Sequence, residues 1–228
     1  MNKVRSLLVA VAAIGSAIVS SGAVDASVDL REYLEVGGHL IPTDIKPNAS
    51  TEIEIDFETA DTTHDKILFC VRNNGFAFLC WLGNKGGKIV CPGFGSTNSL
   101  GDKETGITPG ERILVQLSAK GVLVNGKEVV SGSTMRGCDN GKTSTEILRI
   151  LGMNSDTRTF YGKCYGCRVW QGGTLVRDFL PCVDGSGVPC MYDAVSEDYV
   201  RLESKNQADG VLAASSANRP SSLARPSR

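Results

Sequence analysis

The chain has 228 residues, a formal net charge of −1 and 21% charged residues. A balance this close to neutral lacks the basic surplus that nucleic-acid or anionic-membrane binding requires, so neither is expected as the main partner. The 26 glycines and the shortage of long amphipathic stretches favour many short strands over helices. A chain of this length suits one domain with a sizeable core.

The first residues have the layout of a secretory signal peptide. Lys3 and Arg5 precede an apolar run at residues 7–19, and small residues follow it. The run is too short to span a membrane, so it indicates export, with cleavage after Ala23 or Ala26. No later stretch is long and apolar enough to be a transmembrane segment. We therefore expect a mature protein that is secreted or lies at the cell surface or in the periplasm.

The rest of the chain has the pattern of short strands separated by turns. Residues 51–58 alternate strictly, which places Ile53, Ile55 and Phe57 on one buried face. Asn125-Gly126 lies between two β-branched runs and predicts a type I′ hairpin, because both central residues of that turn need positive φ. Residues 34–41 and 45–47 lead into residues 51–58, and further strands are expected at residues 66–72, 76–82, 88–92, 112–118, 122–124, 127–130, 146–152, 160–170 and 175–181. This spacing predicts an all-β fold, a two-sheet antiparallel β-sandwich or jelly roll.

Two segments carry a family resemblance. Residues 113–130 (ILVQLSAKGVLVNGKEVV) contain a V-N-G-K hairpin, and residues 160–170 (FYGKCYGCRVW) begin with F-x-G and end in Val169-Trp170. These motifs resemble the laminin-G-like, concanavalin A-like lectin/glucanase superfamily. The opening segment around Tyr33 and the closing segment at residues 173–199 extend the resemblance to roughly residues 31–203. It implies a jelly roll, a broad binding role and an exported protein of bacterial or phage-related origin.

Composition and resemblance together divide the chain into three parts. Residues 1–26 are the expected signal peptide, and residues 27–205 the expected laminin-G-like β-sandwich. Residues 206–228 are rich in Ala, Ser, Pro and Arg. Such a tail buries too little apolar surface to order itself, so we expect it to be disordered.

Eight cysteines in an exported chain point first to disulfides. Cys182 and Cys190 bracket a short Gly/Pro-containing loop that could fold back and bring them together. Cys80 and Cys91 flank a Gly-rich turn, and a tight turn there would place them opposite each other across a hairpin. We predict the first bridge and keep the second as a further candidate.

Cys164-x-x-Cys167 also has the spacing of a redox pair or of half a zinc site. A redox pair needs a helix start, whereas these residues lie in an expected strand. The spacing of the cysteines also permits a tetrahedral zinc site, if Cys182 and Cys190 supply two ligands beside Cys164 and Cys167. The resemblance places Cys164 and Cys167 inward, so we interpret them as core thiols or as disulfide partners of other cysteines, Cys138 or Cys70.

One local match suggests catalysis. Glu54, Asp56 and Glu58 have the E-x-D-x-E spacing of retaining β-glucanases that share this sandwich. In those enzymes the first Glu is the nucleophile, the last is the acid/base, and the Asp tunes the pair. Glu52 extends the alternation, however, so the set also matches an ordinary solvated strand face. The motif also lies early in the domain, in a stretch without tryptophans.

Candidate ligand contacts are few. Flat aromatic faces stack on sugar rings, and the available ones are Trp81, Tyr161 and Trp170, although Trp170 ends a run that we interpret as facing inward. Calcium is the one cofactor that the resemblance suggests, because laminin-G-like domains often bind it at the rim. Loop residues that could supply oxygen ligands are Asp61, Asp65, Asp139 and Asn140. Their spacing matches no dedicated calcium loop, so solvated turn residues are the preferred interpretation.

The sequence therefore predicts an exported, non-catalytic binding module for a glycan or a surface partner protein. One alternative is a retaining glycoside hydrolase that uses Glu54 and Glu58. The other is a structural module of a surface or adhesive assembly that binds no small ligand.

Overall fold

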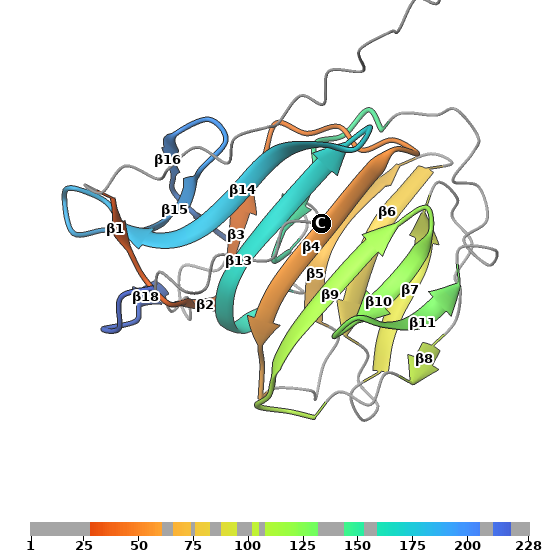
Figure 1. The fold of residues 1–228 in the computed structure, drawn as a ribbon, viewed down its shortest axis with the longest axis horizontal. Coiled ribbons are helices and arrows are strands. Elements are labelled where there is room, and N and C mark those ends of the chain that lie inside the picture. Colours follow the sequence, from red (N-terminus) through yellow and green to blue (C-terminus); the bar gives the residue numbers. More distant parts are fainter. Residues whose placement is uncertain are drawn as a thin grey trace, which may run out of the picture.

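The computed structural model describes residues 28–60, 66–73, 76–82, 88–94, 102–104, 108–131, 144–152, 159–205 and 212–219. Every named element in these ranges is a β-strand, and the strands pair antiparallel into two sheets (Figure 1). This arrangement confirms the predicted two-sheet antiparallel β-sandwich. Within the same ranges no helix is long and apolar enough to cross a membrane. The predicted signal peptide, residues 1–26, lies outside them.

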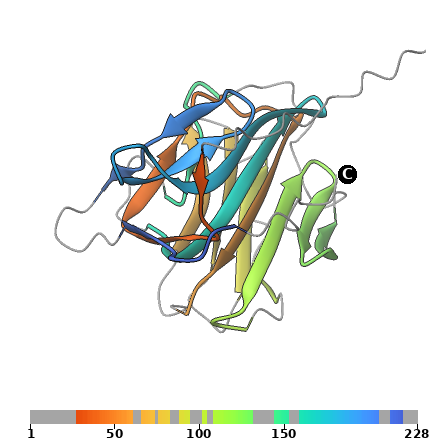
Figure 2. The same ribbon diagram turned by 60° about the vertical axis from the view of Figure 1, so that its left-hand side comes forward.

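The larger sheet has its main strands in the order β11-β10-β9-β4-β13-β14-β15-β16. Their bounds are β11 Lys127–Ser131, β10 Gly121–Val124, β9 Arg112–Ser118, β4 Thr51–Glu58, β13 Tyr161–Gln171, β14 Thr174–Val183, β15 Pro189–Asp193 and β16 Asp198–Val200. Three further short strands of this sheet lie outside that order: β1 (Asp29–Leu30) pairs with β14, β2 (Leu34–Gly37) with β13, and β18 (Leu212–Ala214) with β2. Figures 1 and 2 show β9, β10 and β11, in green, at the opposite end of this sheet from β15 and β16, in blue.

The smaller sheet lies behind the larger one in Figure 1. Its strand order is β17-β3-β12-β5-β6-β7-β8. The bounds are β17 Glu203–Ser204, β3 His39–Pro42, β12 Arg149–Ile150, β5 Lys66–Asn73, β6 Phe76–Leu82, β7 Lys88–Phe94 and β8 Asp102–Glu104.

The hydrophobic core fills the space between the sheets. Ile53, Ile55 and Phe57 of β4 are fully buried in one cluster that includes side chains from both sheets. Phe57 packs edge-to-face on Phe160, with ring centroids 5.6 Å apart. The predicted inner face of residues 51–58 is therefore confirmed.

A β-bulge in β13 decides which side chains face the core. The pairing of β13 with β4 shifts register between Cys164 and Gly166. Side chains alternate across a strand with period two, so residues three apart would otherwise face opposite sides. Because of the extra residue, Cys164 and Cys167 are both fully buried in the core.

The structure explains why two motifs of the family resemblance need glycine or asparagine at their positions. Asn125 and Gly126 have φ of 50° and 78°, and Val124 pairs with Lys127 across them, so the predicted type I′ turn is confirmed. Gly162, the glycine of F-x-G, has φ of 151°, and a Cβ there would lie 2.2 Å from the carbonyl oxygen of Glu58. A side chain at this position would collide with the neighbouring strand.

The end of the chain pairs with its beginning. β17 pairs with β3, and β18 pairs with β2. The backbone N–H groups of Glu32 and Ser215 donate across this junction to the carbonyl oxygens of Ala217 and Tyr33. Residues 212–219, part of the tail expected to be disordered, are therefore ordered, because an open strand edge satisfies their backbone groups where their side chains could not. The remainder of residues 206–228 lies outside the described ranges.

Candidate functional site

The outer face of the larger sheet, the face turned away from the core, carries an organised set of charged and amide side chains. On β4 the residues Glu52, Glu54, Asp56 and Glu58 point to this face, because they alternate with the buried apolar residues. The flanking strands β9 and β13 place cations and amides on either side of them. This face divides into an ion-paired centre and an open pocket at its β11 end.

Asp56 is held by an arginine from β9. Arg112 donates from Nε and Nη2 to the two carboxylate oxygens of Asp56, at 2.9 and 2.7 Å. The same guanidinium lies 4.0 Å from the ring centroid of Tyr165. The hydrogen bonds to Asp56 raise the pKa of Arg112. A two-pronged pair of this kind fixes both side chains in geometry as well as in charge.

Glu58 is held from β13. Lys163 Nζ and the Tyr165 hydroxyl each donate to a different oxygen of Glu58, both at 2.8 Å. The hydrogen bond from Lys163 lowers the pKa of Glu58 and raises that of Lys163. Burial, and then the hydrogen bond to Glu58, raises the pKa of Tyr165. The carboxylate is therefore stabilised in its charged form.

Glu54 sits between two strands. Gln116 of β9 donates its side-chain N–H to Glu54 at 2.8 Å, and Arg168 of β13 approaches within 3.9 Å. Arg168 also lies 3.4 Å from Asp178 of β14. This chain of contacts crosses four strands and covers Glu54, whose exposed fraction is only 5%.

These contacts correct the sequence-based interpretation of the E-x-D-x-E segment. Glu54 and Asp56 are 5% and 7% exposed, so this is not an ordinary solvated strand face. Each of Glu54, Asp56 and Glu58 instead has its own cationic partner. The sequence of β4 alone could not show this pairing, because the partners come from β9 and β13.

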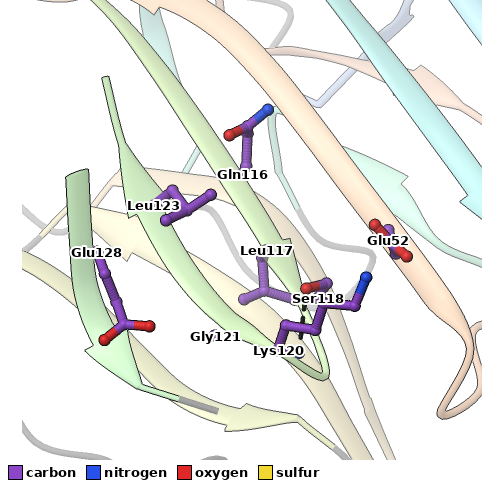
Figure 3. Close-up of a pocket in the computed structure, with 8 residues that line it drawn as sticks. All are labelled: Glu52, Gln116, Leu117, Ser118, Lys120, Gly121, Leu123 and Glu128. Atoms are coloured by element: carbon purple, nitrogen blue, oxygen red, sulfur yellow. Dashed lines mark hydrogen bonds between the residues drawn. The ribbon is translucent and has the colours of Figure 1, made fainter. Parts of the chain in front are cut away.

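A pocket of about 410 Å³ opens beside this centre (Figure 3). Its volume falls in the range of ligand-binding pockets. The lining comes from β4, β9, β10, β11 and the β9–β10 turn: Glu52, Gln116, Leu117, Ser118, Lys120, Gly121, Leu123 and Glu128. Five of the eight lining residues are polar or charged, and the pocket also contains two aliphatic residues, Leu117 and Leu123 (Figure 3).

The ion-paired centre orients one wall of the pocket. The amide nitrogen of Gln116 is turned to Glu54 by their hydrogen bond, so its carbonyl oxygen points the other way, toward the Leu123 side (Figure 3). The Ser118 Oγ accepts a hydrogen bond from the backbone N–H of Lys120 at 3.1 Å, which leaves its hydroxyl hydrogen to donate. Fixed acceptors and donors of this kind suit a ligand rich in hydroxyl groups.

Trp170 lies next to the pocket. It pairs directly with Glu52 in the register of β13 with β4, and its neighbour Val169 is fully buried on the inner face. Trp170 therefore faces outward and is half-buried, which corrects the expectation that it faces inward. Tyr161 is half-buried at the other end of β13, and Trp81 is on β6 of the smaller sheet, with its side chain outside the described part. Among the described side chains, Tyr161 and Trp170 therefore lie at opposite ends of β13.

Cys182 and Cys190 face each other across β14 and β15. They are directly paired in register, both are fully buried, and their Sγ atoms are 3.3 Å apart. Contact with Cys190, together with burial, raises the pKa of the Cys182 thiol. The two thiols are thus placed for the predicted bridge, which stays a prediction.

The other cysteine interpretations separate clearly. Cys164 and Cys167 lie in the main core, whereas Cys182 and Cys190 belong to a different cluster, so the four do not assemble as a zinc site. Cys70 lies in a third cluster with Ile67 and Leu79, away from Cys164 and Cys167. Cys80 is buried, and the register brings it beside residues 91–92 of β7. The side chains of Cys91 and Cys138 lie outside the described part, so the second bridge stays a prediction.

The calcium prediction concerns loops that the structure does not describe. All four candidate ligands fall there: Asp61, Asp65, Asp139 and Asn140. Among the described residues, no group of three or more His, Cys, Asp or Glu side chains gathers closely enough to hold a metal ion.

Comparison with known proteins adds the fold and little more. No protein-family model matches this chain, and no curated protein matches its sequence. A solved structure of a proposed carbohydrate-binding protein from Bacteroides ovatus ATCC 8483 is similar, with a TM-score of 0.53 and 12% identity. The match covers 85% of this chain and 62% of that one, so this chain spans less than two thirds of its length. At this identity the likeness concerns the β-rich fold alone.

Of the eight pocket residues, sequence reasoning considered only Glu52 individually, and it missed Gln116, Lys120, Leu123 and Glu128 among the others. A signal for two of them was present, because Gln116 and Leu123 alternate with buried residues on expected strands. Alternation shows that they face outward, but only the pairing of β9, β10 and β11 shows that they share one pocket with Glu52.

Proposed function

We propose that this chain is an exported, non-catalytic module of a laminin-G-like sandwich that binds a glycan on the outer face of its larger sheet. The observation that carries the proposal is the polar pocket of Figure 3 with the outward-facing Trp170 on the adjoining strand. The similar solved structure from Bacteroides ovatus, itself a proposed carbohydrate-binding protein, also supports glycan binding.

The pocket chemistry suits a saccharide. Sugar hydroxyls both donate and accept, so they can pair with carboxylates, the Gln116 carbonyl oxygen and the Ser118 hydroxyl. Leu123 offers an apolar surface for the C–H face of a ring. Beyond Glu52, Trp170 supplies an aromatic plane on which a second ring can stack. A glycan that crosses from β10 to β13 would use both.

The ion-paired centre favours binding over hydrolysis. A retaining glycosidase needs a general acid whose pKa is raised, with its two carboxyl groups about 5–5.5 Å apart. Lys163 holds the pKa of Glu58 below its ordinary value, which is the opposite direction. Glu54 and Glu58 are also held by separate cations, Arg168 and Lys163.

A glycan panel with two aromatic variants tests the proposal. We expect the purified protein to bind a subset of neutral or charged glycans without releasing reducing sugar. Trp170→Ala should weaken that binding about tenfold or more, a loss of about 1.4 kcal/mol. Tyr199→Ala is the matched control, because Tyr199 is an aromatic residue 45% exposed on β16, at the far end of the same sheet.

The outcomes separate the alternatives. Equal glycan binding by Trp170→Ala and wild type would contradict a binding site on the outer face of the larger sheet. Absence of glycan binding would overturn it in favour of a structural or protein-binding module. Glycan hydrolysis by the wild type that is lost in Glu54→Gln would instead support the glycoside hydrolase alternative. Export is tested separately, because the secreted protein should begin at Val24 or Ser27.

A further inference from the structure

The pocket has an uneven charge. Glu52 and Glu128 contribute two carboxylates to its lining, and Lys120 contributes one ammonium group, so the formal sum is one negative charge. No arginine or histidine is among its lining residues. A concave site with one sign of charge favours ligands of the other sign.

The charges are also separated in space. In Figure 3 the ammonium end of Lys120 extends toward the Glu52 side of the pocket. Glu128 lies on the opposite side, beyond Leu123 (Figure 3). Glu128 is directly paired with Leu123 in the register of β10 with β11 and is exposed. The cation therefore offsets one end of the pocket, and the Glu128 end keeps its negative charge.

The neutral groups of the pocket add acceptors at this negative end. The Gln116 amide is fixed by Glu54, and its carbonyl oxygen faces the Leu123 side (Figure 3). A group that donates several hydrogen bonds and carries positive charge fits between a carbonyl oxygen and a carboxylate. A carboxylate or sulfate at the same place would meet only acceptors and negative charge.

We infer that the pocket selects saccharides by charge: it prefers a sugar with a protonated amine to a neutral sugar, and a neutral sugar to a uronate. This inference rests on the proposed glycan-binding function and names the class of glycan. Glu128 is the selecting side chain, and Lys120 limits the preference by offsetting part of the negative charge.

The test compares three oligosaccharides by calorimetry with the full chain. They are β-1,4-linked glucosamine oligomers, their N-acetylated neutral counterparts and oligogalacturonates of equal length. We expect affinity to fall about fivefold at each step from amine to neutral to uronate, as one charge pair at about 4 Å in water would give. The amine preference should fade as salt rises from about 0.01 M to about 1 M, where the Debye length shrinks to about 3 Å.

Two variants should move the preference in opposite directions. Glu128→Gln removes the negative end and should make the amine and neutral oligomers bind alike. Lys120→Gln makes the pocket more negative and should widen the amine preference about fivefold. Glu111→Gln is the matched control, because Glu111 is an exposed carboxylate outside the pocket lining, and it should change nothing. All three positions are exposed, and equal melting temperatures would confirm intact folding.

The failures are distinguishable. Uronates that bind as tightly as amines, or variants that leave the order unchanged, would overturn charge selection. If binding in that case still depends on Trp170, the proposed function stands. If none of the three oligomers binds and the wider glycan panel is negative as well, both are overturned.

Discussion

The outer face of the larger sheet contains two groups of carboxylates with different fates. Glu54 and Asp56 are nearly buried and are held by Arg168, Gln116 and Arg112. Glu52 and Glu128 line a pocket a few residues away. Glu52 and Glu54 even share one strand and one face. What separates the two groups is the set of neighbouring strands, which cover Glu54 and Asp56 with Arg168, Gln116 and Arg112 and open into a pocket at Glu52 and Glu128.

The difference teaches how to judge a charged strand face. A carboxylate that the fold has already paired and covered is part of the structure, and its removal should cost stability. A carboxylate at a pocket is available to a ligand, and its removal should change binding while leaving stability nearly intact. Spacing along one strand cannot distinguish these cases.

The largest expected loss of stability is on the buried side of β4. Ile55→Ala should lower the free energy of unfolding by about 2–5 kcal/mol, because it leaves a cavity in a packed core. Ile55 is fully buried between the sheets. Urea denaturation measures the loss, with Glu111→Ala as the exposed control. If the two variants were equally mild, the register of β4 would be wrong.

The buried thiols of Cys182 and Cys190 form a contact that can become covalent. A bridge between Cys182 and Cys190 should add about 2–3 kcal/mol by restricting the unfolded chain. Protein from an oxidising compartment should yield a linked peptide in a non-reduced map, and reductant should lower its midpoint of unfolding. Recovery of both cysteines as alkylated thiols after unfolding would contradict the bridge.

Glu54→Gln tests the paired carboxylates directly. The variant loses its ionic contact with Arg168 and weakens the hydrogen bond from Gln116, so unfolding should become easier by about 1–2 kcal/mol. Glu128→Gln, at the exposed pocket carboxylate, should change stability by about 0.5 kcal/mol or less. Both values come from urea denaturation at neutral pH. Equal small effects would show that the outer face of β4 is solvated after all.

The smallest expected effect is a pH dependence at Glu58. Its pKa is lowered from about 4.5 by Lys163, so its contribution is complete above that value and is lost as the pH falls through the lowered pKa. The carboxylate is partly open to solvent, so the contribution should stay below about 1 kcal/mol. Glu58→Gln should therefore lose less stability than wild type between about pH 5 and pH 2. Parallel pH profiles would contradict the pairing.

Local patterns predicted much of the fold. The alternation of residues 51–58 places Ile53, Ile55 and Phe57 in the core, and Asn125-Gly126 forms the expected turn. The segment 189–193 was not expected as a strand, although it forms β15. Its pairing with β14 depends on a neighbouring strand as much as on its own residues.

The candidate site was less predictable. Trp170 and Glu52 could be named from the sequence, but their adjacency follows from the pairing of β13 with β4. The inward face of both Cys164 and Cys167 follows from a bulge that no local motif announces. Residues 212–219 are ordered only because the edge of β2 accepts them.

By itself, the sequence determined the all-β class, the buried face of β4 and the hairpin at Asn125, because hydrophobic period and turn chemistry act over a few residues. Only the tertiary structure decided which charges are paired. Glu58 and Lys163 are 105 residues apart in the chain, and Glu54 and Gln116 are 62 apart. Contacts of that separation arise when strands come together in a sheet, so the division of one polar face into an ion-paired centre and a pocket belongs to the fold.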